Sequence, residues 1–296
     1  MSVFSVLPRT SATPQEEYLL RTAALPVAGI VALAVIASEP APQDEGSSVR
    51  SATASRGPHT ALQQERLEMP AVPRGHAFYF TRAQYSSWGG RGRGWGMGSW
   101  ATDFPKADRQ FLIGLKHLTN IDAYPLEHPI RFDDPDILRY PLVYALEVGY
   151  MELTPAEVDG LRNYLLHGGF LVIDDFWGTW EWANFEREIR QVLPEYDIVD
   201  IDLDHPLLHS FYRIDEILQV PARGRGIGGR PTWEQDGFIP RLLGIFDETG
   251  RLLVVINWNT DLGDAWEWAE DPWYPIEYSN FAYQMGVNMI VYGMSH

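Results

Sequence analysis

The segment from Thr154 to Trp182 constrains the fold more than any other part of the chain. Thr154 precedes Pro155 and stands three residues before Glu157, which is the spacing of a helix-capping box. Apolar residues then recur at helical spacing. Gly168 and Gly169 can supply the left-handed residue that ends a helix. The pattern predicts a helix that begins at Thr154 and ends at the glycine pair.

A short apolar run, Phe170 to Ile173, follows the glycine pair. It lacks alternation, which is typical of a strand buried on both faces of a parallel sheet. Asp174 and Asp175 come next, at the carboxyl end of this strand. Open α/β sheets place their ligand sites at that edge. The segment therefore predicts a helix–strand unit with a candidate site at its end.

The rest of the chain from Gly75 onward repeats this alternation with short connections. Such an order favours an α/β fold with a mostly parallel sheet covered by helices on both faces. A late hairpin is expected to add an edge to the sheet. Strands are expected at 76–80, 130–132, 142–146, 170–173, 198–201, 242–246 and 252–256, and further helices at 105–118, 180–193 and 278–292.

The N-terminal part of the chain has a different character. The uninterrupted apolar run Ala23 to Ala37 is shorter than the roughly 18–20 residues of a spanning helix. It ends in Val35-Ile36-Ala37, which resembles a signal-peptidase site. We expect residues 1–37 to be an export signal or, alternatively, an uncleaved signal anchor in contact with the membrane. The folded part would then be periplasmic or membrane-anchored outside the cytoplasm.

A tract rich in Pro, Ser, Ala and Gln follows this segment. Residues 38–74 show no sustained apolar period and are expected to be a flexible linker. The folded domain is expected to comprise residues 75–296.

Composition excludes several classes of function. The net charge of −17 argues against a nucleic-acid partner, which would require a basic face. The absence of cysteine excludes thiol nucleophiles, disulfides and thiolate metal sites. Two Gly/Arg-rich stretches, 88–100 and 220–237, could form opposite walls of the entrance to a binding cleft. The first lacks phosphate-loop spacing and is interpreted as a surface loop, so no cofactor is predicted.

Acidic residues supply the candidate catalytic groups. Asp174 or Asp175 could act as a general base, a nucleophile or a metal ligand; the alternative is a helix cap or a pair with arginine. Glu267 lies between Trp266 and Trp268, and such surroundings can raise the pKa of a general acid. The alternative for Glu267 is a rim carboxylate paired with a loop arginine.

Three residues from the first part of the domain are candidate ligand-binding groups. Arg82, with Tyr85, is expected at the end of the first strand, where it could hold a carboxylate or phosphate. The alternative is an ion pair between Arg82 and Asp174 or Asp175. Trp100 is the last residue of the first glycine-rich stretch, which has an aromatic residue at each end. This suggests that the loop packs against another part of the protein.

His205 is a further candidate, since it follows Asp202 and Asp204. These residues could meet at a strand end, but a metal site needs three or more converging ligands. A histidine that is hydrogen-bonded within a turn is the alternative, and no metal site is assigned.

A polar stretch near the C-terminus completes the candidates. Asn257, Asn259, Asp261 and Asp264 superficially resemble a calcium loop. The match fails because the sixth position is Leu262 rather than glycine and the twelfth is Trp268 rather than glutamate. A polar loop on the same rim as Asp175 is the alternative.

A set of motifs in the region from His76 to the C-terminus resembles an uncharacterised bacterial envelope family, the domain of unknown function 4159. The motifs include F-Y-F-T-R-A-Q-Y, D-F-P-K-A-D, Y-P-L-V-Y, G-G-F-L-V-I-D-D, L-D-H-P-L-L-H-S-F-Y and N-W-N-T-D-L-G-D-A-W-E.

That family in turn resembles the class I glutamine-amidotransferase-like superfamily, which implies a flavodoxin-like three-layer sandwich. Asp175 falls at the sharp turn where active amidotransferases carry cysteine. The chain has no cysteine, so thiol-dependent glutamine hydrolysis is excluded.

Two functional hypotheses follow. The first is a non-catalytic, exported binding module that holds a small molecule or an envelope protein partner in the cleft at the carboxyl ends of the strands. The second is a cysteine-independent hydrolase of an envelope glycan or amide, in which Asp175 and either Asp174 or Glu267 act as acid and base.

Overall fold

The computed structural model describes residues 75–88 and 99–296. The expected export segment (1–37), the expected linker (38–74) and residues 89–98 of the first glycine-rich stretch lie outside the described residues. Within the described ranges, no helix is both long enough and apolar enough to cross a membrane.

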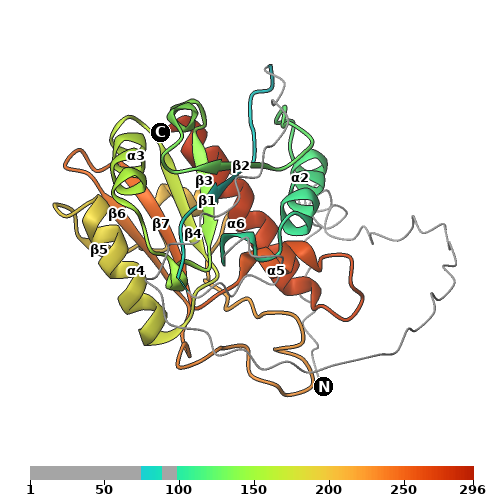
Figure 1. The fold of residues 1–296 in the computed structure, drawn as a ribbon. Coiled ribbons are helices and arrows are strands. Elements are labelled where there is room, and N and C mark those ends of the chain that lie inside the picture. The colour runs from blue at the N-terminus through green and yellow to red at the C-terminus, as the bar shows by residue number, and fades with distance from the viewer. Residues whose placement is uncertain (1–74, 89–98) are drawn as a thin grey trace, which may run out of the picture. The chain divides into compact units, whose positions relative to one another are not determined.

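A seven-stranded sheet forms the centre of the described chain, in the order β2-β1-β3-β4-β7-β6-β5 (Figure 1). The first five strands in this order run parallel, β6 is antiparallel to β7, and β5 is antiparallel to β6. The parallel part has the flavodoxin-like order 2-1-3-4-5, with β7 in the fifth position. The strands are β1 (Thr81–Gln84), β2 (His128–Arg131), β3 (Leu142–Leu146), β4 (Phe170–Asp174), β5 (Ile198–Asp200), β6 (Arg241–Phe246) and β7 (Leu252–Trp258).

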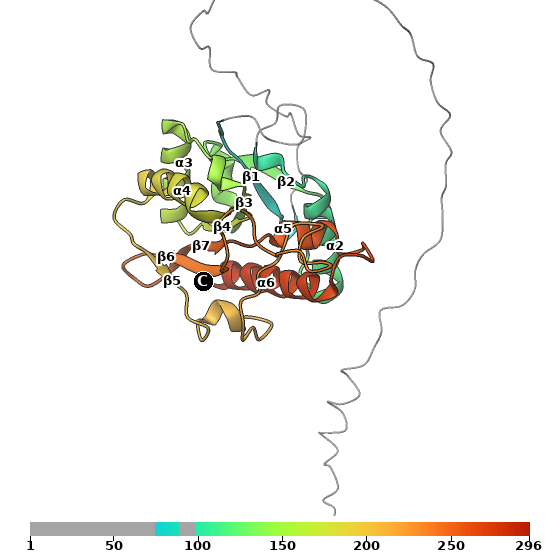
Figure 2. The ribbon, with the colours of Figure 1, turned by 90° about the horizontal axis from the view of Figure 1, so that it is seen from below.

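Helices cover both faces of the sheet. Helices α3 and α4 lie on one face, and α2, α5 and α6 lie on the other (Figure 2). Strand β3 shows why both faces are apolar: Tyr144 points into one core cluster, whereas Val143 and Ala145 point into the other. The helices are α2 (Lys106–Leu118), α3 (Pro155–Leu166), α4 (Gly178–Val192), α5 (Leu262–Glu267) and α6 (Ile276–Ser295), with short 3₁₀ helices at Ser99–Ala101, Pro135–Arg139, Val148–Tyr150 and Pro206–His209.

The predicted helix–strand unit is confirmed. Thr154 caps α3, and both halves of the capping box with Glu157 are present. Gly168 has a φ of 103° after the end of α3. Strand β4 is buried along its whole length. The alternation of helices and strands and the mostly parallel sheet are confirmed as well.

The first strand was predicted five residues too early. Residues 76–80 contribute an isolated bridge at Phe78, and the strand itself is Thr81–Gln84. This four-residue sequence reads as polar, yet all four residues are buried. It can be buried because Arg82 forms an ion pair with Asp108, which lies in α2.

The late hairpin is confirmed as antiparallel, but it does not simply add an edge. Strand β7 lies inside the sheet and pairs in parallel with β4, with Leu171 opposite Val254. Strands β6 and β5 continue the sheet beyond it. This arrangement places the carboxyl end of β7 beside that of β4.

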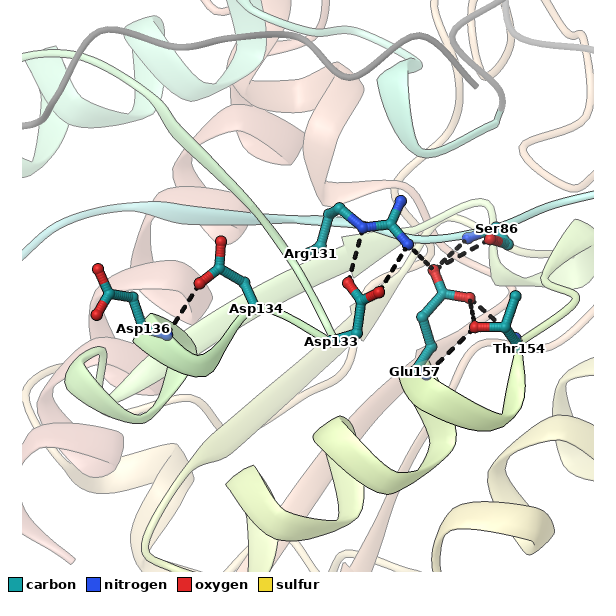
Figure 3. Close-up of polar contacts among 7 residues, drawn as sticks. All are labelled: Ser86, Arg131, Asp133, Asp134, Asp136, Thr154 and Glu157. Atoms are coloured by element: carbon teal, nitrogen blue, oxygen red, sulfur yellow. Dashed lines mark hydrogen bonds and ion pairs between the residues drawn. The ribbon is translucent and has the colours of Figure 1, made fainter. Parts of the chain in front are cut away.

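One buried carboxylate joins three elements of the parallel half of the sheet (Figure 3). Glu157 is fully buried at the start of α3. One of its oxygens accepts bonds from the backbone N–H of Ser86 (2.9 Å) and lies 3.5 Å from Arg131 in β2. The other oxygen accepts the Thr154 N–H at 2.9 Å. Glu157 thus fixes the chain leaving β1 against β2 and α3.

Candidate functional site

A cleft of about 990 Å³ opens at the carboxyl ends of the parallel strands. Glu147 directly follows β3, Asp175 directly follows β4, and Asp261 lies three residues beyond β7. Trp88 and Asp103 belong to the connection after β1. The cleft therefore lies at the carboxyl edge of the sheet, where open α/β sheets bind their ligands.

The cleft is strongly acidic. Two arginines, Arg223 and Arg225, also line it, and each is already engaged: Arg223 pairs with Asp271 and Arg225 with Glu234, at 2.7 and 2.8 Å. Eight lining residues are acidic: Asp103, Glu147, Asp175, Glu181, Glu234, Asp261, Asp264 and Glu267.

Five of these acids form an inner carboxylate cluster, made of Asp103, Asp175, Asp261, Asp264 and Glu267. Oxygen atoms of Asp103, Asp175 and Asp261 all lie within 4.8 Å of one another, and so do oxygens of Asp103, Asp264 and Glu267. Asp103 is common to both triads. Each triad offers as many carboxylate ligands as a divalent-cation site commonly uses.

Unusual backbone geometry accompanies the acidic side chains. Asp103, Glu147 and Asp175 have φ values of 59°, 54° and 47°, in the left-handed region that non-glycine residues rarely occupy. Gln235, which also lines the cleft, has a φ of 48°. Such conformations carry a cost and gather at functional sites.

Burial and mutual repulsion change the acidity of these groups. Burial raises the pKa of Asp103, Asp175 and Asp261 well above the usual aspartate range, and neighbouring carboxylates raise it further. Burial, reinforced by Glu181 and Glu234, raises the pKa of Glu147 to about 8. The cleft therefore favours any cation that can replace these protons.

Asp103 also has an unsatisfied atom. Its Oδ2 is buried and has no hydrogen-bond partner within the described residues. Such an atom costs free energy unless a ligand satisfies it. A cation between the two triads would do so.

Three predicted site residues line the cleft, and Asp174 does not. Asp175, Asp261 and Glu267 are lining residues. The Asp174 Oδ2 accepts bonds from the Tyr144 hydroxyl (2.6 Å) and from two backbone N–H groups at the start of α5. Asp174 thus anchors α5 to the sheet.

Arg82 lies beneath the cleft, and the pairing expected for it was wrong. Its partner is Asp108 instead of Asp174 or Asp175. The Arg82 guanidinium also donates to the carbonyl oxygens of Trp100 (3.5 Å) and Thr102 (3.3 Å). Arg82 thus supports the backbone immediately before Asp103.

Tyr85 and Trp100 are also buried under the site rather than lining it. The Tyr85 hydroxyl donates to the Leu146 carbonyl at 2.5 Å and lies 3.1 Å from the Ser99 hydroxyl. Trp100 packs its ring against Phe104. Tyr85 thus ties the chain after β1 to the end of β3.

The two asparagines bond to neighbouring backbone, Asn257 between two strands and Asn259 between loops. Asn257 donates to the Ile173 carbonyl at 2.9 Å. Asn259 accepts the Gly178 N–H at 2.9 Å and donates to the Ile239 carbonyl at 2.8 Å. Neither is a lining residue of the cleft.

His205 is not brought to the cleft. It caps the 3₁₀ helix Pro206–His209 by accepting the Leu207 N–H at 3.2 Å, and its ring contacts Phe246 and Tyr292. This is the hydrogen-bonded turn histidine that was the alternative interpretation.

Sequence reasoning missed Asp103, Glu147, Glu181 and Glu234, and it rejected the segment of Asp264 as a calcium loop. That segment is instead the N-terminus of α5, where Asp261 accepts the Asp264 N–H at 2.7 Å. The D-F-P-K-A-D motif that begins at Asp103 was a signal that could have pointed to the site.

An aromatic rim, made of Trp88, Tyr150 and Trp180, borders the cleft. The three ring centroids lie 5.5–5.9 Å apart. Trp88 and Trp180 are 40% and 49% exposed. Large aromatic rings that stay exposed beside a cleft are available to a ligand.

The comparisons with known proteins bear on the chain as a whole. A search among curated proteins finds no match. A protein-family comparison matches residues 80–294 to the family described as Domain of unknown function (DUF4159). This match covers most of the chain, from β1 into the last turn of α6, and includes every acidic residue of the cleft. The chain belongs to this family of proteins with a domain of unknown function.

Proposed function

We propose that this chain is a binding module that holds a small ligand in its acidic cleft with the help of divalent cations. The observation that carries the proposal is the pair of carboxylate triads that share Asp103. The buried Oδ2 of Asp103, which has no hydrogen-bond partner in the described part of the chain, supports it, because a cation would satisfy that atom.

The ligand atoms favour a hard cation. Carboxylate oxygens suit Ca²⁺, Mg²⁺ and Mn²⁺. Two oxygens on opposite sides of a calcium ion at about 2.4 Å are separated by about 4.8 Å. The ligand oxygens of each triad all lie within 4.8 Å of one another, so each triad is compact enough to surround one such ion.

The amidotransferase-like resemblance agrees with a binding role. Asp175 directly follows β4 with a φ of 47°, as expected of a residue at a sharp strand-to-helix turn. With no cysteine in the chain, this turn presents a carboxylate to the cleft. The expected export segment favours a bacterial cell-envelope location, where the ligand is a small molecule or part of an envelope protein.

A hydrolase is the second candidate. Its support is that Asp175 and Glu267 line the same cleft and that burial raises the pKa of both carboxyl groups. Asp174 is unsuited to this role because its carboxylate is fully buried and bonded to Tyr144 and α5. An envelope glycan or amide would be the substrate.

Calorimetric titration of the protein with CaCl₂, MgCl₂ and MnCl₂ tests the proposal. The native protein should bind at least one of these cations, and Asp103→Asn should lose at least tenfold in affinity because both triads lose a ligand. Asp204→Asn is the matched control, since Asp204 is exposed and outside the cleft. Equal binding by Asp103→Asn and the native protein would refute the site.

A further inference from the structure

A second group of residues lines the same cleft beside the inner carboxylate cluster, and it is called the outer subsite here. It consists of Glu147, Glu181 and Glu234, which act electrostatically on one another, and the aromatic rim of Trp88, Tyr150 and Trp180. Glu234 is paired with Arg225. Aromatic faces and carboxylates together are the recognition chemistry of organic cations.

The outer carboxylates and the aromatic rim are held against each other. The Trp88 N–H donates to the Tyr150 carbonyl at 3.1 Å. The Tyr150 side chain is hydrogen-bonded to Glu181, which directly follows Trp180 in α4. The Tyr150 N–H in turn donates to the Glu147 carbonyl at 3.1 Å. Rings and carboxylates therefore form one connected wall.

Glu181 is fixed in place, whereas Glu147 is available. Glu181 accepts the Trp177 N–H at 2.6 Å and a bond from Gln235. A Cβ at Gly149 would meet the Glu181 side chain at 2.4 Å, so this glycine leaves room for it. No hydrogen bond or ion pair joins the Glu147 carboxylate to another side chain in residues 75–88 and 99–296.

We propose that this outer subsite binds the primary ammonium group of an organic cation, with Glu147 accepting its hydrogen bonds and Trp88 and Trp180 covering its alkyl chain. The ligand class would be an aliphatic polyamine or another small polyamine-like molecule. The inference goes beyond the proposed function, because it adds a subsite for an organic cation to the same cleft.

Spermidine is the probe, and 1,8-octanediol, a neutral chain of the same length, is its counterpart. Titrations would be made at 150 mM NaCl, because the chain carries a net charge of −17 and would otherwise attract any polycation. The native protein should bind spermidine and not the diol. Glu147→Gln and Trp180→Ala should each weaken binding at least tenfold, whereas Asp204→Asn should not.

Two further measurements separate this inference from the proposed function. Saturating CaCl₂ should weaken spermidine binding without abolishing it, because Glu147 lies close enough to Asp175 to act on it electrostatically. Loss of spermidine binding in calcium would place the amine in the inner cluster and overturn the inference. If the protein bound calcium normally but did not bind spermidine, the inference would also be overturned, whereas the proposed cation site would stand.

The thermal stability of each variant provides the folding control. Trp180 is half-exposed and Glu147 keeps its size and left-handed backbone in Glu147→Gln, so both variants should melt within a few degrees of the native protein. If Glu147→Gln and Asp204→Asn bound spermidine equally, the amine would be held by general surface charge and the inference would fail.

Discussion

Asp103→Asn is the substitution that most sharply distinguishes a cation ligand from a structural carboxylate. Asparagine has the same shape and tolerates a φ of 59°. It removes one carboxyl group from a set of buried, mutually repelling acids, in which burial, Asp264 and Glu267 already raise the pKa of Asp103. Without cations, the variant should therefore melt at the same temperature as the native protein or above it.

In the presence of cations, the native protein should instead melt at a higher temperature than Asp103→Asn. A cation at a hundredfold excess over its Kd stabilises the folded state by about 2.7 kcal/mol. For a domain of about 220 residues, each kcal/mol corresponds to roughly 2–4 °C in Tm. The native protein should thus gain roughly 5–11 °C in saturating CaCl₂ or MnCl₂, and Asp103→Asn should gain little.

Differential scanning calorimetry with and without cation, with Asp204→Asn as control, measures both effects. A structural role for Asp103 predicts the opposite pattern, in which the variant melts several degrees lower without cation and responds to cation like the native protein. That result would refute the reasoning.

Three further predictions follow from the same contacts. Burial raises the carboxyl pKa of Glu147 to about 8, so between about pH 4.5 and about pH 8 the folded state holds a proton that the unfolded chain has released. Without cations, the stability of the protein should therefore fall as pH rises through this window. A Tm that rises across the window in calorimetry would contradict this prediction. Glu157→Ala removes a helix cap and bonds to Ser86 and should lower the free energy of unfolding by about 2–4 kcal/mol in urea titration; a change below about 1 kcal/mol would refute the role of this network. Arg82→Met leaves Asp108 buried without its partner and should lower the free energy of unfolding by about 3–5 kcal/mol. The double variant Arg82→Met with Asp108→Leu should recover much of that loss. Equal stability of the single and double variants would contradict the pairing.

Sequence patterns predicted the parts of the fold that depend on neighbours along the chain. The capping box at Thr154, the glycine pair and the buried strand β4 are all local, and each is confirmed. The position of β1 is not local. Its buried arginine is satisfied by Asp108, 26 residues later, so a hydrophobic pattern could not reveal it.

In the candidate site too, local features could be predicted from the sequence and long-range ones could not. Asp175, Asp261 and Glu267 could be proposed because strand ends and flanking tryptophans are visible in the sequence. Asp103 was marked only by the D-F-P-K-A-D motif and Glu147 only by its place after β3. Their approach to the other carboxylates depends on the strand order and on left-handed backbone that no local pattern predicts. The inner cluster is therefore a property of the assembled sheet.

Anomalous diffraction from crystals grown with MnCl₂ tests the central claim most directly. The account predicts a manganese peak within coordination distance, about 2.1–2.3 Å, of a carboxylate oxygen of Asp103, shared with Asp175 and Asp261 or with Asp264 and Glu267. Crystals of Asp103→Asn should lack that peak. An empty cleft in the native protein at millimolar manganese, with these carboxylates unchanged, would contradict the account.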